Sequence, residues 1–372
     1  MRVLTHDDPI TEQRIRRLDS LRGLAAVAVV FHHCIHISDP GISERVLNQS
    51  LSSLGNYDFV GRFVLSFAAG GMAVYVFFIL SGCVLHFSFS RIPEVNIGSM
   101  IGFIVRRCFR LYPVAIVSVI LIAAFSYLWL PQGRGEPYSL EELFLNVLLL
   151  NNSVNGATWT IQAELLMVPI LMAVGIAFRM FGVLAIVGFI FFAQTFLFYG
   201  APVFPVLLSV TAPAFGLGMF AAFYTSSCKA IKIRPWMVYS LLLSLPAIRF
   251  WYPIGELYGI ILILFVSTML IIFLIKCIDR VSLLDNIILT KVGDLSYSIY
   301  LMHVLVAYQL YPIYEKIFGL TFPNPRYILH GLTYSLIVLL LTLPIAAAVE
   351  RYVEKPFMAF GKMLALRVQV RM

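Results

Sequence analysis

Long apolar segments separated by short polar connections dominate the chain. A transmembrane helix needs about 20 mostly apolar residues, and we find such segments, two of them marginal, along the whole sequence. They are residues 21–38, 67–89, 110–130, 157–178, 183–199, 202–224, 236–252, 255–275, 292–312 and 327–348. The first and seventh are the marginal ones. Residues 143–150 are too few to span, so we expect a re-entrant or interfacial segment there. The pattern predicts an all-α, polytopic membrane bundle with about ten transmembrane helices.

The basic residues between these segments predict how the bundle is oriented. If the N-terminus is cytosolic and the spans alternate, most of the 27 Lys and Arg residues fall on the cytosolic side. This is the distribution that the positive-inside rule describes. We therefore predict that both termini are cytosolic. We expect one domain over residues 1–372, with a cytosolic N-terminal tail over 1–20 and a basic cytosolic C-terminal tail over 349–372.

Composition supports a membrane protein and excludes a large soluble domain. The chain is 60% hydrophobic and 12% charged, whereas soluble domains are about one quarter charged. The net charge of +8 lies in residues that flank the apolar segments, so we expect a lipid bilayer and anionic ligands as partners, and no nucleic acid. The five cysteines have neither C-x-x-C nor zinc spacing, which predicts free thiols.

The first predicted span carries ionisable groups at an unusual depth. His33 follows Arg22 along the helix and lies about 16 Å deeper in the membrane. Ionisable groups at that depth often serve function, and an imidazole can take a proton from a hydroxyl at neutral pH. A packing histidine is the alternative, and the adjacent His32 is a second candidate. His36 follows His32 by one helical turn, but a third ligand is lacking, so we predict no metal.

Three arginines open the third span on the predicted cytosolic side. Arg106, Arg107 and Arg110 lie within five residues. Positive-inside anchoring accounts for one or two of them. Three together also suit a phosphate clamp, because guanidinium groups bind phosphate in a bidentate manner.

Three further spans contain polar groups within apolar surroundings. Ser81 and Gly82 allow close approach of a helix or of a ligand chain. Glu164 lies about two turns into the fourth span, where a buried carboxylate needs a partner. It could orient an imidazole or bind a sugar hydroxyl, with Trp159 as a stacking platform, or make a structural hydrogen bond. His303 places another imidazole in the ninth span.

Taken in order, these blocks resemble the integral-membrane acyltransferase-3 family, which includes polysaccharide, lipopolysaccharide and Nod-factor O-acetyltransferases. The resemblance rests on Arg17–Gly23 with His33 in an R-x10-H register, Phe77–Gly82, Arg107-x-x-Arg110 with Pro113, Trp159–Glu164, Leu295–His303 and Glu354–Phe357. Thr160 stands where the family usually has serine. His32 adds a second imidazole beside the family's histidine.

The resemblance implies an acyl-CoA-dependent O-acyltransferase in the bacterial inner membrane. The acyl group, acetyl by family precedent, would pass from cytosolic acyl-CoA to a hydroxyl of a cell-surface or membrane-linked carbohydrate or glycolipid. The predicted site comprises His33 and Glu164 as catalytic residues, Arg22, Arg106, Arg107 and Arg110 as donor-binding residues, and Trp159, His303 and Ser81 as substrate contacts.

Several alternatives stay open at this point. A proton-coupled small-molecule transporter would also use intramembrane His and Glu, although the sequence shows no inverted repeat or paired broken helices. His33 could act as a general base or carry the acyl group briefly itself. The small residues at Ser81 and Gly82 leave longer acyl chains possible.

Overall fold

The computed structural model describes residues 9–128, 138–199, 206–228, 233–318 and 326–371, and these form helices and connections without a β-strand. The α-helices are α1 (Pro9–Ser38), α2 (Asn56–Phe67), α3 (Gly70–Ser90), α4 (Ile97–Leu128), α5 (Leu140–Val147), α6 (Trp159–Phe181), α7 (Val183–Tyr199), α8 (Val206–Ser227), α9 (Pro235–Trp251), α10 (Leu257–Lys276), α11 (Ile287–Asp294), α12 (Ser296–Phe318), α13 (Tyr327–Val349) and α14 (Lys355–Arg371). Short π or 3-10 turns are η1 (Ser43–Leu47), η2 (Leu51–Ser53), η3 (Gly156–Thr158) and η4 (Glu350–Glu354). The all-α prediction is confirmed for the described residues.

Six helical segments of the described chain are long and apolar enough to cross a membrane. They are Arg16–Ser38, Asn56–Ser90, Ile97–Tyr127, Gly156–Phe181, Leu257–Lys276 and Tyr327–Gln369. Each of the predicted spans falls on a helix, but the total of ten and the orientation stay predictions. Residues 1–8 of the predicted N-terminal tail, 129–130 of the third span, 202–205 of the sixth and 372 lie outside the described residues.

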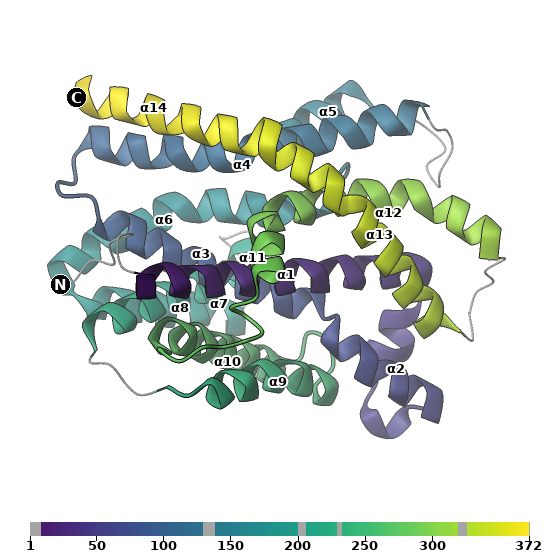
Figure 1. The fold of residues 1–372 in the computed structure, drawn as a ribbon. Helices are drawn as coiled ribbons and strands as arrows, with labels where there is room; N and C mark the ends of the chain where they lie inside the picture. The colour runs from purple at the N-terminus through teal and green to yellow at the C-terminus, as the bar shows by residue number, and fades with distance from the viewer. Residues whose placement is uncertain (1–8, 129–137, 200–205, 229–232, 319–325, 372) are drawn as a thin grey trace.

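Helix α1 runs through the middle of the bundle, with α3, α11, α12 and α13 packed against it (Figure 1). The contact with α11 depends on two glycines, which let the backbones approach closely. A Cβ atom on Gly23 would lie 2.9 Å from the backbone nitrogen of Gly293, and one on Gly293 would lie 2.0 Å from the backbone oxygen of Asp19. This packing fixes α1 near Arg22, the first residue of the predicted site.

Arg17 anchors the first part of α1 and is fully buried. Its Nε donates to Asp285 Oδ1 at 2.6 Å, and its Nη1 donates to the backbone oxygen of Cys277 at 2.8 Å. A buried guanidinium needs such partners because desolvation of a charge is costly. The first arginine of the Arg17–Gly23 block is therefore structural, which the sequence did not predict.

Helices α3 and α8 cross at close range through Gly82 and Gly218. A Cβ atom on Gly82 would lie 2.2 Å from the backbone oxygen of Phe215, and one on Gly218 would lie 2.0 Å from that of Ile79. Of the two interpretations of Gly82, close approach of a helix is the one that the structure shows, because the backbone of α8 fills the space beside it.

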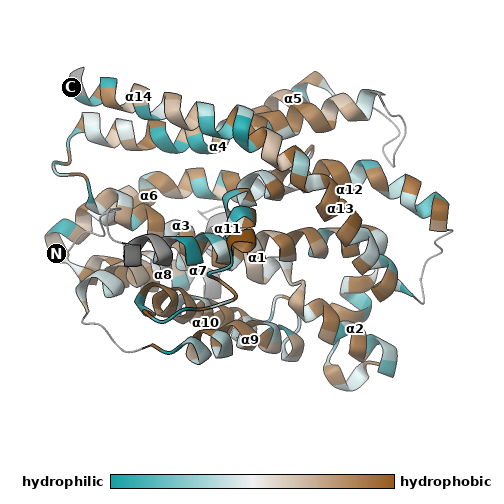
Figure 2. Ribbon diagram, viewed as in Figure 1, coloured by the Kyte–Doolittle hydropathy of each residue, from teal (hydrophilic) through white to brown (hydrophobic). Residues whose placement is uncertain are grey.

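The basic C-terminal segment is helical and lies along α4 (Figure 1). Figure 2 shows hydrophilic turns along α14 and the adjoining part of α4, whereas α10 is mostly hydrophobic. Glu354, at the joint between α13 and α14, is buried and accepts a hydrogen bond from Ser298 Oγ at 2.9 Å. It thus ties α12 to the joint.

Candidate active site

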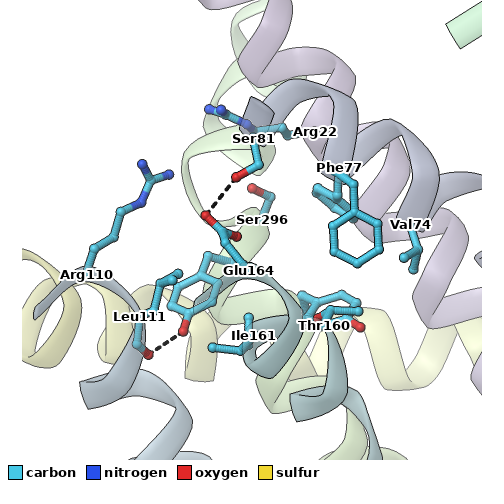
Figure 3. Close-up of a pocket in the computed structure, with 13 residues that line it drawn as sticks. Arg22, Val74, Phe77, Ser81, Arg110, Leu111, Thr160, Ile161, Glu164 and Ser296 are labelled. Carbon is cyan, nitrogen blue, oxygen red and sulfur yellow. Dashed lines mark hydrogen bonds between the residues drawn. The ribbon is translucent and has the colours of Figure 1, made fainter. Parts of the chain in front are cut away.

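A small cavity, which we call the basic chamber, lies among α1, α3, α4, α6 and α12. Its volume is about 90 Å³, and Arg22, Arg110 and Glu164 are the charged residues that line it. Figure 3 shows Arg110 reaching in from one side, with Phe77 and Val74 on the opposite side. The chamber therefore combines charged, hydroxyl-bearing and apolar lining residues.

Glu164 is the acidic group of the basic chamber. Its Oε1 accepts a hydrogen bond from Ser81 Oγ at 2.7 Å and lies 3.8 Å from Arg107 Nη1 (Figure 3 shows the serine bond). Arg107 is only 7% exposed, so this carboxylate offsets a buried positive charge. Glu164 and Ser81 lie together as a pair, and neither lines the cavity that contains His33.

The predicted arginines divide into two groups. Arg22 and Arg110 line the basic chamber and Arg107 contacts its carboxylate. Arg22 Nη1 also donates to Asp19 Oδ1 at 2.9 Å. Arg106 is half-buried and does not line the chamber. Arg22 and the two arginines of α4 meet here although more than eighty residues separate them in sequence.

His33 and His303 form a stacked, hydrogen-bonded pair between α1 and α12. Their rings lie 5.0 Å apart at an angle of 17°, and His33 Nδ1 is 2.8 Å from His303 Nε2. His303 is fully buried, and its Nδ1 is 3.1 Å from the backbone oxygen of Ile299. This pairing brings together two of the predicted site residues.

The hydrogen bond between His303 and the backbone oxygen of Ile299 indicates which ring nitrogens carry protons when both histidines are neutral. A carbonyl oxygen only accepts, so His303 Nδ1 carries a proton and donates it. His303 Nε2 is then an acceptor, and the proton between the rings belongs to His33 Nδ1. His33 Nε2 is consequently unprotonated and has a free lone pair. This is the state that a general base requires.

His32 faces a different part of the protein from His33. A Cβ atom on Gly70 would lie 2.6 Å from the His32 ring, so the imidazole packs tightly against the start of α3. His32 lines a separate cavity of about 360 Å³, near Arg249. Its ring is 4.3 Å from that of His36, but no group of three or more metal-ligating side chains occurs among the described residues.

A larger cavity, which we call the wide cavity, contains His33. Its volume is about 660 Å³, and its lining includes His36, Tyr308, Tyr311 and Glu315. The buried hydroxyl of Tyr311 has no hydrogen-bond partner among the described residues. Cavities of roughly 300–1,000 Å³ are typical of small-molecule sites, so this one has room for a substrate.

Trp159 does not line either the basic chamber or the wide cavity. Its ring packs edge-on against Phe78 at 5.9 Å. Two residues close to Trp159 in the sequence do line the cavities. Thr160 lines the basic chamber, and Ala157 lines the wide cavity.

The tyrosines that line the two cavities were not among the predicted site residues. Tyr297 and Tyr300 line the basic chamber, while Tyr308 and Tyr311 line the wide cavity. All four lie on α12. The two tyrosines of each cavity are three residues apart, which places them on one helix face, and this is the signal that could have found them.

Fold and site together define a helical membrane protein with a basic chamber beside a histidine pair. A family model described as an acyltransferase domain matches residues 15–351. Because the match covers most of the chain, the protein belongs to the acyltransferase-3 family and is a multi-pass integral membrane acyltransferase. No curated protein and no solved structure matches the chain. The family match gives no support to the transporter alternative.

Proposed function

We propose that the protein transfers an acyl group, acetyl in the first instance, from cytosolic acyl-CoA to a hydroxyl of a cell-surface or membrane-linked carbohydrate. The family match supports acyl transfer. The observation that carries the mechanism is the His33–His303 pair at the wall of the wide cavity. The proposal includes about ten transmembrane helices, cytosolic termini and a bacterial inner membrane. In that arrangement the basic chamber faces the cytosol and the wide cavity faces outward.

The arginines of the basic chamber support an anionic donor. An apolar cavity of about 150 Å³ holds a benzene molecule, so a chamber of about 90 Å³ admits only the thioester end of acyl-CoA. The nucleotide phosphates would bind at the entrance through Arg106 and Arg110, because guanidinium groups hold phosphate in a bidentate manner. Glu164 keeps Arg107 in place by offsetting its charge.

The wide cavity supports a carbohydrate acceptor. Its volume of about 660 Å³ suits a sugar unit, and its tyrosines and Glu315 supply hydrogen-bonding groups. The unpartnered hydroxyl of Tyr311 is available to a substrate hydroxyl. Because His33 lines the same cavity, an acceptor bound there lies beside the base.

His33 Nε2 removes the proton of the acceptor hydroxyl in this mechanism. The oxygen attacks the thioester carbonyl, the new C–O bond forms, and the C–S bond breaks. The His33 imidazolium then returns the proton to the CoA thiolate. His303 accepts the Nδ1 hydrogen bond throughout and so stabilises the imidazolium. A short-lived acyl-His33 intermediate would use the same lone pair.

Purified protein in proteoliposomes, supplied with radiolabelled acetyl-CoA and a glycan acceptor, tests this function. We expect His33→Ala to lower the rate of transfer by roughly 100-fold or more, the usual contribution of a general base. His32→Ala is the matched control, because His32 lies outside the wide cavity, and it should retain transfer. A His33→Ala protein that inserts and still transfers at the wild-type rate would contradict the proposal.

A further inference from the structure

A third cavity lies next to the wide cavity and has no role in the proposed mechanism. We call it the Arg249 cavity. It lies among α1, α2, α3, α9 and α10 and has a volume of about 360 Å³. His36 lines both the Arg249 cavity and the wide cavity. Because His36 follows His33 by three residues, or roughly 4.5 Å along the helix axis, a molecule bound beside His33 lies within one helical turn of the Arg249 cavity.

Arg249 places a buried positive charge at the wall of this cavity. The residue is only 7% exposed. Its Nη1 donates to the backbone oxygen of Tyr252, and its Nη2 donates to that of Leu47 at 3.4 Å. Within the part of the chain that the structure describes, Arg249 forms no ion pair with a carboxylate. A buried guanidinium without an acidic partner favours the binding of an anion, because its desolvation is not offset by an opposite charge.

A second guanidinium lies close to that of Arg249. Arg62 is fully buried, and its Nη1 donates to the backbone oxygen of Leu47 at 2.7 Å. This oxygen therefore accepts hydrogen bonds from both arginines, which brings two like charges close together. Arg62 Nη2 has no hydrogen-bond partner among the described residues. Since like charges at short range repel one another, a bound anion would stabilise this arrangement.

The first turn of α3 adds to the positive potential of the Arg249 cavity. Residues 69–72, which contain that turn, line the cavity. The turn has no acidic residue and no side-chain cap. The first N–H groups of a helix have no intrahelical partner and carry a partial positive charge. A helix N-terminus beside a guanidinium group is a suitable site for phosphate.

Two other polar residues line the cavity without contributing to such a site. His32 is hydrogen-bonded to the backbone of Ala68 and packs against Gly70, so its ring is part of the wall. Glu256 is half-buried at the start of α10 and forms no ion pair with Arg249. Its single negative charge opposes an anion, but the two guanidinium groups outnumber it.

We propose that the Arg249 cavity binds a phosphate group of the acceptor, held by Arg249, the first turn of α3 and His36. His36 Nε2 is buried and has no partner among the described residues, so it is available to a phosphate oxygen. The inference rests on the proposed function and adds that the acceptor is a phosphorylated carbohydrate, either lipid-linked or free of lipid. In the proposed orientation α1 and α9 both run outward, which places this cavity on the acceptor side. With its phosphate there, the sugar occupies the wide cavity beside His33.

Phosphate binding can be measured separately from transfer. Full-length protein in detergent is titrated with inorganic phosphate and with a short-chain prenyl phosphate, and the rise in Tm with concentration gives the affinity. We expect Arg249→Ala to raise Kd about tenfold or more, because it removes a charged hydrogen-bond donor. Binding of the prenyl phosphate alone would support a lipid-linked acceptor. Binding of both probes would support recognition of the phosphate itself.

Gly71→Asp decides the matter if Arg249→Ala fails to fold. Nothing lies within 4 Å of a Cβ atom on Gly71, so the side chain fits, and an acidic residue is favourable in the first turn of a helix. The new carboxylate should repel phosphate and raise Kd about tenfold or more. Gly71→Asn is the matched control, because it has the same size without the charge, and its Kd should stay near that of the wild type. Equal affinities of these two variants, or no stabilisation of the wild type by either probe, would overturn the site.

Transfer kinetics in proteoliposomes connect the site with the acceptor. The acceptors are one glycan with a phosphate group and the same glycan without it. Gly71→Asp should raise KM for the phosphorylated glycan, with little change in kcat, and should leave KM for the neutral glycan unchanged. An unchanged KM for the phosphorylated glycan would overturn the role in acceptor binding. A wild-type protein that binds phosphate but transfers no acyl group would instead overturn the proposed function and leave the phosphate site standing.

Discussion

Individual residues of the site could be predicted, but their partners could not. The depth of His33 and its register after Arg22 were visible in the sequence. Its contact with His303 joins residues 270 positions apart, and no local pattern reports such a contact. The same holds for Ser81 and Glu164, whose bond spans 83 positions. The chemical groups were visible in the sequence, and tertiary packing determines which of them meet.

His303 fixes the tautomer of His33, and substitution at this position tests that role. Glutamine can place an amide oxygen near the position of Nε2 and accept the His33 Nδ1 hydrogen, whereas alanine cannot. We expect His303→Ala to lower kcat by at least about 10- to 100-fold, the loss typical when the outer hydrogen-bond partner of a metal-bound histidine is removed, with little change in KM. His303→Gln should recover most of that loss.

The pH dependence separates this positioning role from a structural one. In His303→Ala the imidazolium of His33 loses the hydrogen bond that stabilises it. The acid limb of the kcat–pH profile should therefore shift toward lower pH. A variant with normal expression, an unshifted profile and equal losses for alanine and glutamine would show that His303 acts only through packing.

At the scale of helices, apolar periodicity predicted where elements lie better than it predicted how they pack. The apolar ranges fall on helices, and the five cysteines are free, as expected. Glu354 follows the last predicted span in the sequence, and only the structure shows that its carboxylate is buried against Ser298. Hydropathy averages over a segment, so it does not show which single polar side chain faces a neighbouring helix.

The α3–α8 crossing gives a prediction at this scale. Gly218→Ala would place a Cβ atom 2.0 Å from the backbone oxygen of Ile79, which is far inside van der Waals contact. The helices must separate, and we expect lower thermal stability in detergent and a loss of transfer. Gly188→Ala is the matched control, because nothing lies within 4 Å of a Cβ there. It should be neutral or slightly stabilising, since alanine favours helix by about 1 kcal/mol over glycine. Equal stability of the two variants would show that the crossing is not tight.

At the scale of the whole molecule, the proposed function assigns the donor to one cavity and the acceptor to the other. The basic chamber contains Arg22 and Arg110, and the larger wide cavity is lined by His33 of the histidine pair. Hydropathy and charge predicted a basic side of the bundle, but cavities depend on side-chain packing, which a sequence pattern does not define. Under the proposed function, donor and acceptor enter from opposite faces of the membrane.

The most direct test of this account is the sidedness of transfer in proteoliposomes of known orientation, with a tag at the N-terminus to report which face is exposed. Radiolabelled acetyl-CoA would be supplied on one face at a time, with a glycan acceptor on the other. The account predicts transfer only when acetyl-CoA is on the face that carries the N-terminus, from which α1 leads to Arg22 and the basic chamber. Transfer from acetyl-CoA supplied only on the opposite face would contradict it.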